Sequence, residues 1–292
     1  MRRNGMVLVA DTAAQIPAKE FDRWGVEVCN YPMYVDGEPI DVSAGMSDEA
    51  KEEIRMLLKD KNRNVSTSGL REEDLLEIYR RHADEPILSL HMSATASSAT
   101  AQVVTKIIQE HPELDITHYD SRHLVEGYSI IVKEAARRMN AGASREEMDA
   151  FLKAAPLRTR HHGVVFDLFY LQRTGRIGTA KAVMGTAMKI IPMLSATDPP
   201  GNLKSSGKVK KPLQAVKKFV DFIERDRELW PNAPLKALIS VQGPHREEAE
   251  ELKSAIEQLE GDVDVVLYGC SHSNLPHAGP DYFGLGYMLM DE

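Results

Sequence analysis

The sequence lacks long apolar runs and contains little cysteine. Its 292 residues include two cysteines, Cys29 and Cys270, which lie far apart and match no metal-ligand spacing. So few cysteines are typical of a reducing compartment. A membrane helix needs about 18 uninterrupted apolar residues, and no apolar stretch of this sequence comes near that length. The first apolar run, residues 7–10, ends at Asp11 and is too short for a secretion signal. We therefore expect a cytoplasmic protein.

The sequence also lacks an excess of positive charge. Lysine and arginine together number 36 against 44 acidic residues, which gives a net charge of -8 with histidine neutral. Non-specific binding to nucleic acid depends on a basic surface, so we expect no nucleic-acid partner. The remaining composition, 42% hydrophobic and 27% charged, is that of an ordinary globular protein. The length predicts two domains with enough chain to enclose one or two cores.

Several common catalytic motifs are absent as well. The sequence has no G-x-x-x-x-G-K-[ST] phosphate loop, no G-x-G-x-x-G after a strand and no G-x-S-x-G around a serine. The adjacent His161 and His162, and the pair Cys270 and His272, do not complete a metal-ligand set. We therefore expect no metal ion and no nucleotide chemistry of the phosphate-loop type.

The order of apolar patterns predicts an α/β fold in the first half of the chain. Strands at residues 6–10, 87–90 and 114–119 and an extended stretch at 26–34 alternate with helices at 47–60, 72–81, 99–110, 127–140 and 144–155. Such alternation is typical of a mainly parallel sheet flanked by helices.

The second half predicts a mixed sheet with helices. Strands are expected at 163–166, 190–196, 235–242 and 263–268, and a hairpin returns through 207–211. Helices are expected at 169–173, 212–227 and 245–261, and a further helix is expected to end near residue 188. Pro156 should end the preceding helix, and the polar run at 157–162 is a candidate linker. We therefore divide the chain into an N-terminal α/β domain, residues 1–157, and a C-terminal α/β domain, residues 158–292.

Hydroxyl side chains gather where one predicted strand ends. The strand at 87–90 is followed by serine or threonine at five of the eight positions from 93 to 100, just before a helix. A helix start offers free backbone N–H groups and a positive dipole end, which suits an anion. Capping alone would need one or two hydroxyls. Residues 66–68 repeat this composition before the helix at 72–81, and capping is a sufficient explanation there.

Further candidates lie at a strand end and in two loops. Ligands of parallel sheets gather beyond the carboxyl ends of the strands, where Asp11 and Thr12 are expected. Arg176 follows a glycine in a turn, and His277 lies in the C-terminal loop. Taken alone, each fits an ordinary surface or loop residue.

A nucleophilic serine is the enzymatic alternative. Ser93 would need His277 as its base and Asp11 or Asp120 as the carboxylate that orients the histidine. The sequence permits this grouping, but no local motif supports it.

Six segments in register resemble the DegV family of bacterial fatty-acid-binding proteins. They are Asp11-Thr12 after the first strand, Thr67-Ser68, Ser93-Ala94-Thr95-Ala96-Ser97-Ser98-Ala99, Asp120-Ser121 with Gly127, Tyr170-Leu171 through Gly175-Arg176-Ile177, and His277-Ala278-Gly279-Pro280. The resemblance covers nearly the whole chain. It implies a two-domain α/β protein that buries an acyl chain between or beneath its domains. Such a protein has no catalysis of its own and no cofactor beyond the bound long-chain fatty acid.

The resemblance also implies roles for individual residues. Thr67 and Ser93 would hydrogen-bond the fatty acid carboxylate, assisted by the backbone around Ala94. Arg176 and His277 would balance its charge or receive the phosphorylated head group. Thr95 completes this set, and three further candidates are Asp11, Thr12 and Ser68.

The partners follow from the same resemblance. A separate fatty acid kinase would phosphorylate the presented carboxylate, and the acyl phosphate would pass to phospholipid synthesis. Transient membrane contact is expected during loading.

The chain departs from the family pattern at several positions. Ala94 and Asp281 each replace a glycine, and Ala96 stands where an aromatic residue is common. We expect Asp281 to add negative charge near the head group. Two rival functions stay open: a Ser93/His277 hydrolase or acyltransferase, and a regulatory module that binds another small carboxylate.

Overall fold

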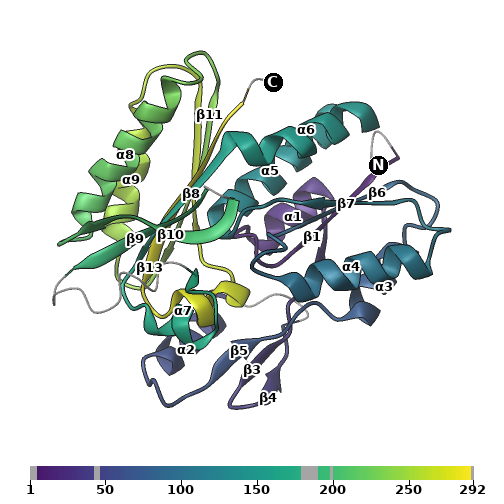
Figure 1. Cartoon of the computed structure of the whole chain (residues 1–292), viewed down its shortest axis with the longest axis horizontal. Coiled ribbons are helices and arrows are strands. Elements are labelled where there is room, and N and C mark those ends of the chain that lie inside the picture. Colours follow the sequence, from purple (N-terminus) through teal and green to yellow (C-terminus); the bar gives the residue numbers. More distant parts are fainter. Residues whose placement is uncertain (1–4, 43–46, 179–189, 198–199, 291–292) are drawn as a thin grey trace.

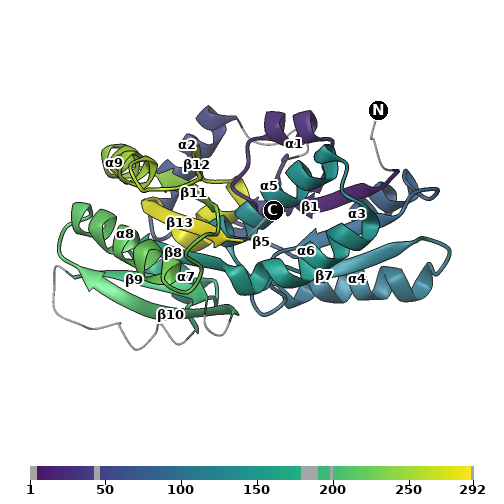
Figure 2. The ribbon, with the colours of Figure 1, turned by 90° about the horizontal axis from the view of Figure 1, so that it is seen from above.

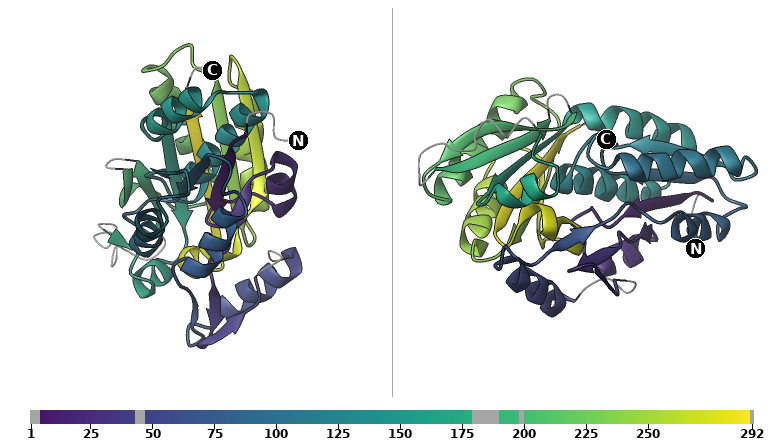
Figure 3. Two further views of the ribbon diagram at one scale, coloured as in Figure 1. Left: turned by 90° about the vertical axis from the view of Figure 1, so that its right-hand side faces the viewer. Right: turned by 60° about the horizontal axis from the view of Figure 1, so that its bottom comes forward.

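The computed structural model describes residues 5–42, 47–178, 190–197 and 200–290, and these residues form three β-sheets (Figure 1). A four-stranded sheet and a six-stranded sheet lie side by side (Figure 2). A small three-stranded sheet projects at one end of the molecule (Figure 3). The predicted α/β class, with one parallel and one mixed sheet, is confirmed.

The four-stranded sheet is parallel throughout. Its strands, in order, are β2 (Glu27–Cys29), β1 (Val7–Asp11), β6 (Ile87–His91) and β7 (Ile116–Asp120). Helices α3 (Glu72–Arg80) and α4 (Ser98–Glu110) pack together on one side, and α5 (Val125–Ala141) and α6 (Arg145–Arg158) lie on the other (Figure 1). Every residue of β1 and β6 is buried, as expected for central strands with helices on both faces.

The six-stranded sheet is mixed. Its strands, in order, are β10 (Pro200–Val209), β9 (Ile191–Thr197), β8 (Thr159–Val165), β13 (Tyr282–Leu289), β11 (Leu235–Gln242) and β12 (Val263–Gly269). Only the pair β11 and β12 is parallel among these described strands. Helices α8 (Leu213–Arg227) and α9 (Arg246–Glu257) cover one face. Helix α5 covers the other face, so alternate residues of β13 contribute to two different cores.

Helix α5 therefore belongs to both halves of the molecule. It packs against β1 of the parallel sheet and against β8, β11 and β13 of the mixed sheet. Gly286 of β13 permits this close approach, because a Cβ atom there would collide with the backbone of Glu126. The amphipathic pattern at 127–140 predicted the helix, but a helix buried against two sheets shows less of a polar face than a surface helix.

The small sheet and three short helices form a third layer. The sheet has the order β4 (Glu38–Ile40), β3 (Met33–Val35) and β5 (Val65–Thr67). It shares a core with α2 (Asp48–Leu58), α7 (Phe169–Arg173) and α10 (Leu275–Ala278), so segments from the start, middle and end of the chain meet here. The sequence predicted one extended stretch at 26–34, and the structure divides it between β2 and β3.

Residues 157–162 are not the predicted linker. Helix α6 continues through Pro156 to Arg158, and β8 begins at the next residue. The polar composition misled the prediction because His161 and His162 are buried in β8. Arg160 is held by Asp226 and stacks on Trp230. The division at residue 157 stays a prediction, and it falls in the last turn of α6, just before the direct junction with β8.

Other differences concern short or unpatterned segments. Helix α1 (Ala18–Trp24) and strand β13 were not predicted. β13 contains two glycines, and all eight of its residues are buried, so it shows no period-2 alternation of polarity. The helix predicted to end near residue 188 lies outside the described residues. None of the helices in the described ranges combines the length and apolar composition needed to cross a membrane.

Candidate functional site

One cavity lies where the three sheets meet. Its wall is formed by the turns after β1 and β6, the N-terminus of α4, the end of β5, strands β8 and β9, and helix α10. Its volume is about 170 Å³, many times the minimum of about 10–15 Å³ that a single water needs on the same measure.

Most of the wall is apolar. Its apolar side chains include Met92, Leu124, Val125, Val165, Leu171, Leu194, Leu203 and Ala278. Two polar residues in the wall, His161 and Tyr282, contact the buried Glu126 at 2.9 and 3.0 Å. Burial and the charge of Glu126 raise the pKa of Tyr282 well above its usual value, so the phenol stays neutral. Gly163 makes room for this ring, because a Cβ atom there would lie 2.6 Å from the phenol oxygen.

The polar end of the cavity contains Thr67, Arg176 and His277. The Thr67 hydroxyl and His277 Nε2 are 3.1 Å apart. Burial, together with the positive charges of Arg176 and Arg173, lowers the pKa of His277 to about 3. The imidazole is therefore neutral near pH 7. If Nε2 carries its proton, the histidine donates to Thr67 and leaves the threonine O–H to donate to a ligand.

Two hydroxyl-rich turns meet at this end. The turn after β5 contributes Thr67, Ser68 and Gly69 to the wall, and the start of α4 contributes Ser97, Ser98 and Ala99. The turns are in contact, because a Cβ atom on Gly69 would lie 2.8 Å from the Cβ atom of Ala99. The positive end of a 13-residue helix thus faces the same space as Thr67.

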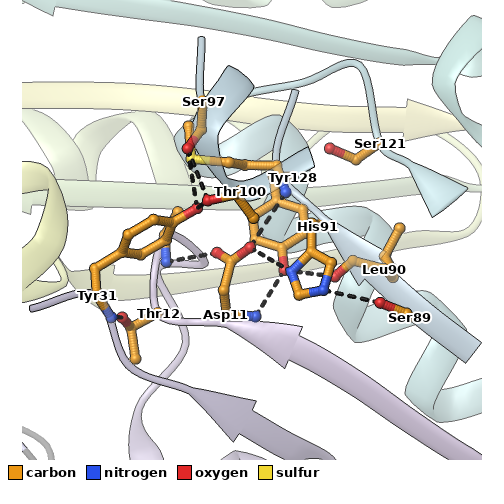
Figure 4. Close-up of polar contacts among 12 residues, drawn as sticks. Asp11, Thr12, Tyr31, Ser89, Leu90, His91, Ser97, Thr100, Ser121 and Tyr128 are labelled. Carbon is orange, nitrogen blue, oxygen red and sulfur yellow. Dashed lines mark hydrogen bonds and ion pairs between the residues drawn. The ribbon is translucent and has the colours of Figure 1, made fainter. Parts of the chain in front are cut away.

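Three hydroxyls cluster at the start of α4 (Figure 4). Thr100 Oγ1 lies 3.0 Å from the Tyr31 hydroxyl and 2.9 Å from Ser97 Oγ. The Tyr31 hydroxyl also lies 3.5 Å from Ser97 Oγ. The Tyr31 backbone N–H donates to Thr12 Oγ1 at 3.1 Å, which fixes the tyrosine relative to the end of β1.

A buried carboxylate supports the turns behind this cluster (Figure 4). Asp11 is fully buried and accepts hydrogen bonds from the backbone N–H groups of Ala13 and Met92, at 2.9 and 3.4 Å. His91 Nδ1 lies 2.9 Å from the same carboxylate and is held in turn by Ser89 at Nε2. Since Ala13 and Met92 line the cavity, Asp11 shapes the cavity through the backbone, although Asp11 itself is not part of the lining.

The structure brings together four of the nine predicted site residues. Thr67, Ser68, Arg176 and His277 line the cavity, whereas the lining does not include Ser93, Ala94, Thr95, Asp11 or Thr12. Ser93 is 1% exposed, and its hydroxyl accepts the backbone N–H of Thr95 at 3.2 Å. The ligand roles given to these residues stay predictions.

Sequence reasoning did not single out several lining residues. Ser97 and Ser98 line the cavity and belong to the same hydroxyl run as Ser93, which the sequence-based prediction emphasised. Tyr31, Ser273 and Asn274 gave no local signal, because their position depends on contacts between distant segments.

The alternative nucleophilic arrangement is not assembled. In the described part of the chain, His277 pairs with Thr67 and not with Ser93. Asp11 pairs with His91, and Asp120 accepts backbone N–H groups of Ala94 and Arg122. Among the described residues there is also no group of three or more histidine, cysteine, aspartate or glutamate side chains that could hold a metal ion.

Fold and site define an α/β protein with a largely apolar cavity and one hydroxyl-rich end beside Arg176. The model of the DegV family, described as uncharacterised proteins, matches residues 6–289, and the chain belongs to this family.

Sequence and structural relatives agree with this assignment. The DegV domain-containing protein YteA of Lactococcus lactis is 30% identical over 224 residues, which cover 75% of this chain and 76% of that protein. A DegV family protein from Thermus thermophilus, solved in a study of its fatty acid binding, superposes with a TM-score of 0.86 at 23% identity, over 99% of this chain and 100% of the other. DegV of Bacillus subtilis, a fatty acid binding protein, gives a TM-score of 0.83 at 18% identity, over 98% and 100%.

Proposed function

We propose that this protein binds a long-chain fatty acid in the cavity and presents its carboxylate, in the cytoplasm, to a separate fatty acid kinase. The acyl phosphate would then enter phospholipid synthesis. The observation that carries the proposal is a largely apolar cavity that ends at Thr67, Arg176 and His277. The fatty acid binding described for the Thermus thermophilus and Bacillus subtilis relatives supports it.

The energetics favour an acyl chain as the ligand. About 14 methylene groups gain roughly 0.8 kcal/mol each when they leave water, or on the order of 11 kcal/mol before costs. Lost translational freedom and ordering of the chain subtract several kcal/mol. Because each methylene adds roughly 0.8 kcal/mol, a long acyl chain is favoured over a short carboxylic acid in the same cavity.

The carboxylate needs hydrogen bonds, because an unpaired buried charge is costly. Thr67 supplies an O–H donor backed by neutral His277, and Arg176 supplies positive charge. Ser68 and Arg176 are exposed, so this end of the cavity lies near solvent, where a kinase can reach the head group. The protein itself would hold and present the acid without reacting with it.

Mass spectrometry of an organic extract of the purified protein tests the binding step. We expect a long-chain fatty acid at close to one equivalent, and a Thr67→Ala/His277→Ala double variant should retain much less. An empty protein that hydrolyses acyl esters, with activity lost in Ser93→Ala, would replace the carrier with an enzyme. A short polar acid in the extract would favour a regulatory module.

Reconstitution tests the presentation step separately. The loaded protein, a purified fatty acid kinase and ATP should yield acyl phosphate, whereas the kinase and free fatty acid without this protein should yield far less. Loading from vesicles that contain hexadecanoic acid tests the proposed transient membrane contact. Equal acyl phosphate formation with and without the protein would remove the kinase from the proposal.

A further inference from the structure

In the apolar part of the cavity wall, the hydrogen bonding of His161 is incomplete. Its Nε2 lies 2.9 Å from a carboxylate oxygen of Glu126, so this nitrogen carries the proton that the carboxylate accepts. Among the described residues, Nδ1 of the same ring is buried and has no hydrogen-bond partner. The residue is 3% exposed and belongs to the cavity wall. A molecule that occupies the cavity is therefore the available partner for Nδ1.

The contacts of Glu126 fix the orientation of this ring. The fully buried carboxylate also accepts the hydroxyls of Tyr282, at 3.0 Å, and Ser240. Because Nε2 is turned towards Glu126, Nδ1 must face away from it. A purely structural network would account for Glu126 and for Nε2. It would leave Nδ1 as an unpaired buried nitrogen, which costs stability and which an apolar side chain in the wall would avoid.

The position of His161 along β8 places this nitrogen beside the acyl chain. Residues 161, 163 and 165 point to the same face of the strand, and all three line the cavity. Val165 shares a core with Ala278, which adjoins His277 at the polar end. Four residues of a strand span roughly 13 Å, so His161 lies about that far along β8 from Val165. The ligand atom that meets His161 is therefore several carbons away from the carboxylate.

A hydroxyl group fits the open nitrogen in either protonation state of the ring. When the proton is on Nε2, neutral imidazole presents a lone pair at Nδ1, whereas imidazolium presents an N–H there. An alcohol both donates and accepts, so it can pair with either form, and a methylene group can pair with neither. A site that hydrogen-bonds a ligand hydroxyl discriminates against the analogue that lacks it, because the polar group of the site is then buried unpaired.

We propose that the ligand is a hydroxylated long-chain fatty acid, and that a hydroxyl on its chain hydrogen-bonds His161 Nδ1. The inference rests on the proposed function and deepens it, because it narrows the ligand to one class of long-chain acids. Glu126 is a positioning residue in this arrangement. It orients the imidazole and is not itself part of the lining.

Calorimetric Kd values for related acids test the inference. Octadecanoic acid differs from 10-hydroxyoctadecanoic acid and 12-hydroxyoctadecanoic acid only in the chain hydroxyl, and 2-hydroxyoctadecanoic acid carries the same group beside the carboxylate. We expect the wild-type protein to bind at least one of the two mid-chain hydroxy acids about tenfold or more tightly than octadecanoic acid. The 2-hydroxy isomer should gain less than about twofold, because its hydroxyl lies too far from His161.

Two adjacent histidines of β8 give a matched pair of variants. His161→Phe removes the open nitrogen and keeps an aromatic ring, so the preference for the mid-chain hydroxyl should fall to less than about twofold. His162 is also buried, but it stacks on Phe222 and does not line the cavity, since neighbouring residues of a strand point to opposite faces. His162→Phe should therefore keep the full preference.

The outcomes separate this inference from the proposed function. Octadecanoic acid bound as tightly as both mid-chain hydroxy acids, or a preference that persists in His161→Phe, would overturn the inference. The wild-type comparison needs no variant, so it decides the matter even where a variant does not fold. Wild-type protein that binds none of these acids would instead reject the proposed function.

Discussion

Two fully buried carboxylates, Asp11 in the parallel sheet and Glu126 at the start of α5, support the cavity in different ways. Each contacts a histidine at 2.9 Å, His91 in one case and His161 in the other. Asp11 also accepts backbone N–H groups from two turns, whereas Glu126 also accepts the hydroxyls of Tyr282 and Ser240. One carboxylate therefore fixes the course of the chain, and the other fixes side chains.

The difference matters because backbone N–H groups and hydroxyl groups respond differently when the carboxylate that accepts from them is replaced. A backbone N–H group in a turn cannot reverse its direction without moving the chain, so it must keep an acceptor. A hydroxyl can rotate and accept where it formerly donated. Substitution of Asp11, on the parallel-sheet side, should therefore cost more stability than substitution of Glu126, on the mixed-sheet side.

The largest expected effect is that of Asp11→Asn. The new amide group must face at least one donor, either a turn N–H or His91, so the unfolding free energy should fall by about 3 kcal/mol. Urea denaturation measures the change. A loss below about 1 kcal/mol would mean that the turns find other acceptors.

A second prediction concerns acid stability on the mixed-sheet side. His162 has no hydrogen-bond partner at either ring nitrogen among the described residues and stacks on Phe222 at 4.4 Å. Burial, with smaller contributions from His161, Arg225 and Arg160, lowers the pKa of His162 from 6.5 to about 3. Between these values the unfolded chain binds a proton that the folded chain does not, so stability is lost as the pH falls below about 6.5.

His162→Phe should remove this contribution. Between pH 7 and pH 4 the variant should lose on the order of 2 kcal/mol less stability than the wild-type protein, as measured by urea denaturation at a series of pH values. His111→Gln, at the end of α4, is the control. Parallel pH profiles of the wild-type protein and the His162 variant would contradict the prediction.

Glu126→Gln should have a smaller effect than Asp11→Asn. The hydroxyls of Tyr282 and Ser240 can rotate to accept from the new amide, so we expect a loss of about 1 kcal/mol. Urea denaturation of both variants under the same conditions compares their unfolding free energies directly. A cost equal to or larger than that of Asp11→Asn would show that the nature of the donor is not what distinguishes the two sites.

The smallest expected effect is that of Asp281→Gly. The sequence suggested that this charge disturbs anion binding, but Asp281 contacts Arg55 at 3.5 Å and does not line the cavity. We expect less than about 0.5 kcal/mol in stability, and less than a twofold change in hexadecanoic acid affinity. Tighter binding of hexadecanoic acid by more than about threefold would support the hypothesis that the charge of Asp281 disturbs anion binding.

The fold was largely predictable from the sequence because local patterns carried the information. Continuous apolar runs predicted β1 and β6, and spacing predicted α4 and α8, since each element buries a face that its own sequence defines. The small sheet was missed because strands of three residues are too short to show alternation.

The site was predictable only in part. The family motifs assigned Thr67 and His277 to one ligand end, and the structure brings the two side chains to 3.1 Å in one cavity wall although 210 positions separate them. Their ligand roles stay predictions. Ser93 and Ser97 are indistinguishable by composition, because both are serines near a helix start. Which one meets the cavity depends on the path of the turn, and that path is set by Asp11, 80 or more positions away from His91 and Met92.

The central position of β13 has a consequence for synthesis. This strand lies between β8 and β11, yet it follows both of them in the sequence. A nascent chain cannot complete the mixed sheet until β13 has left the ribosome, and one flank of α5 stays uncovered until then. A chain that stops before β13 should be prone to aggregation and proteolysis rather than form a shorter working protein.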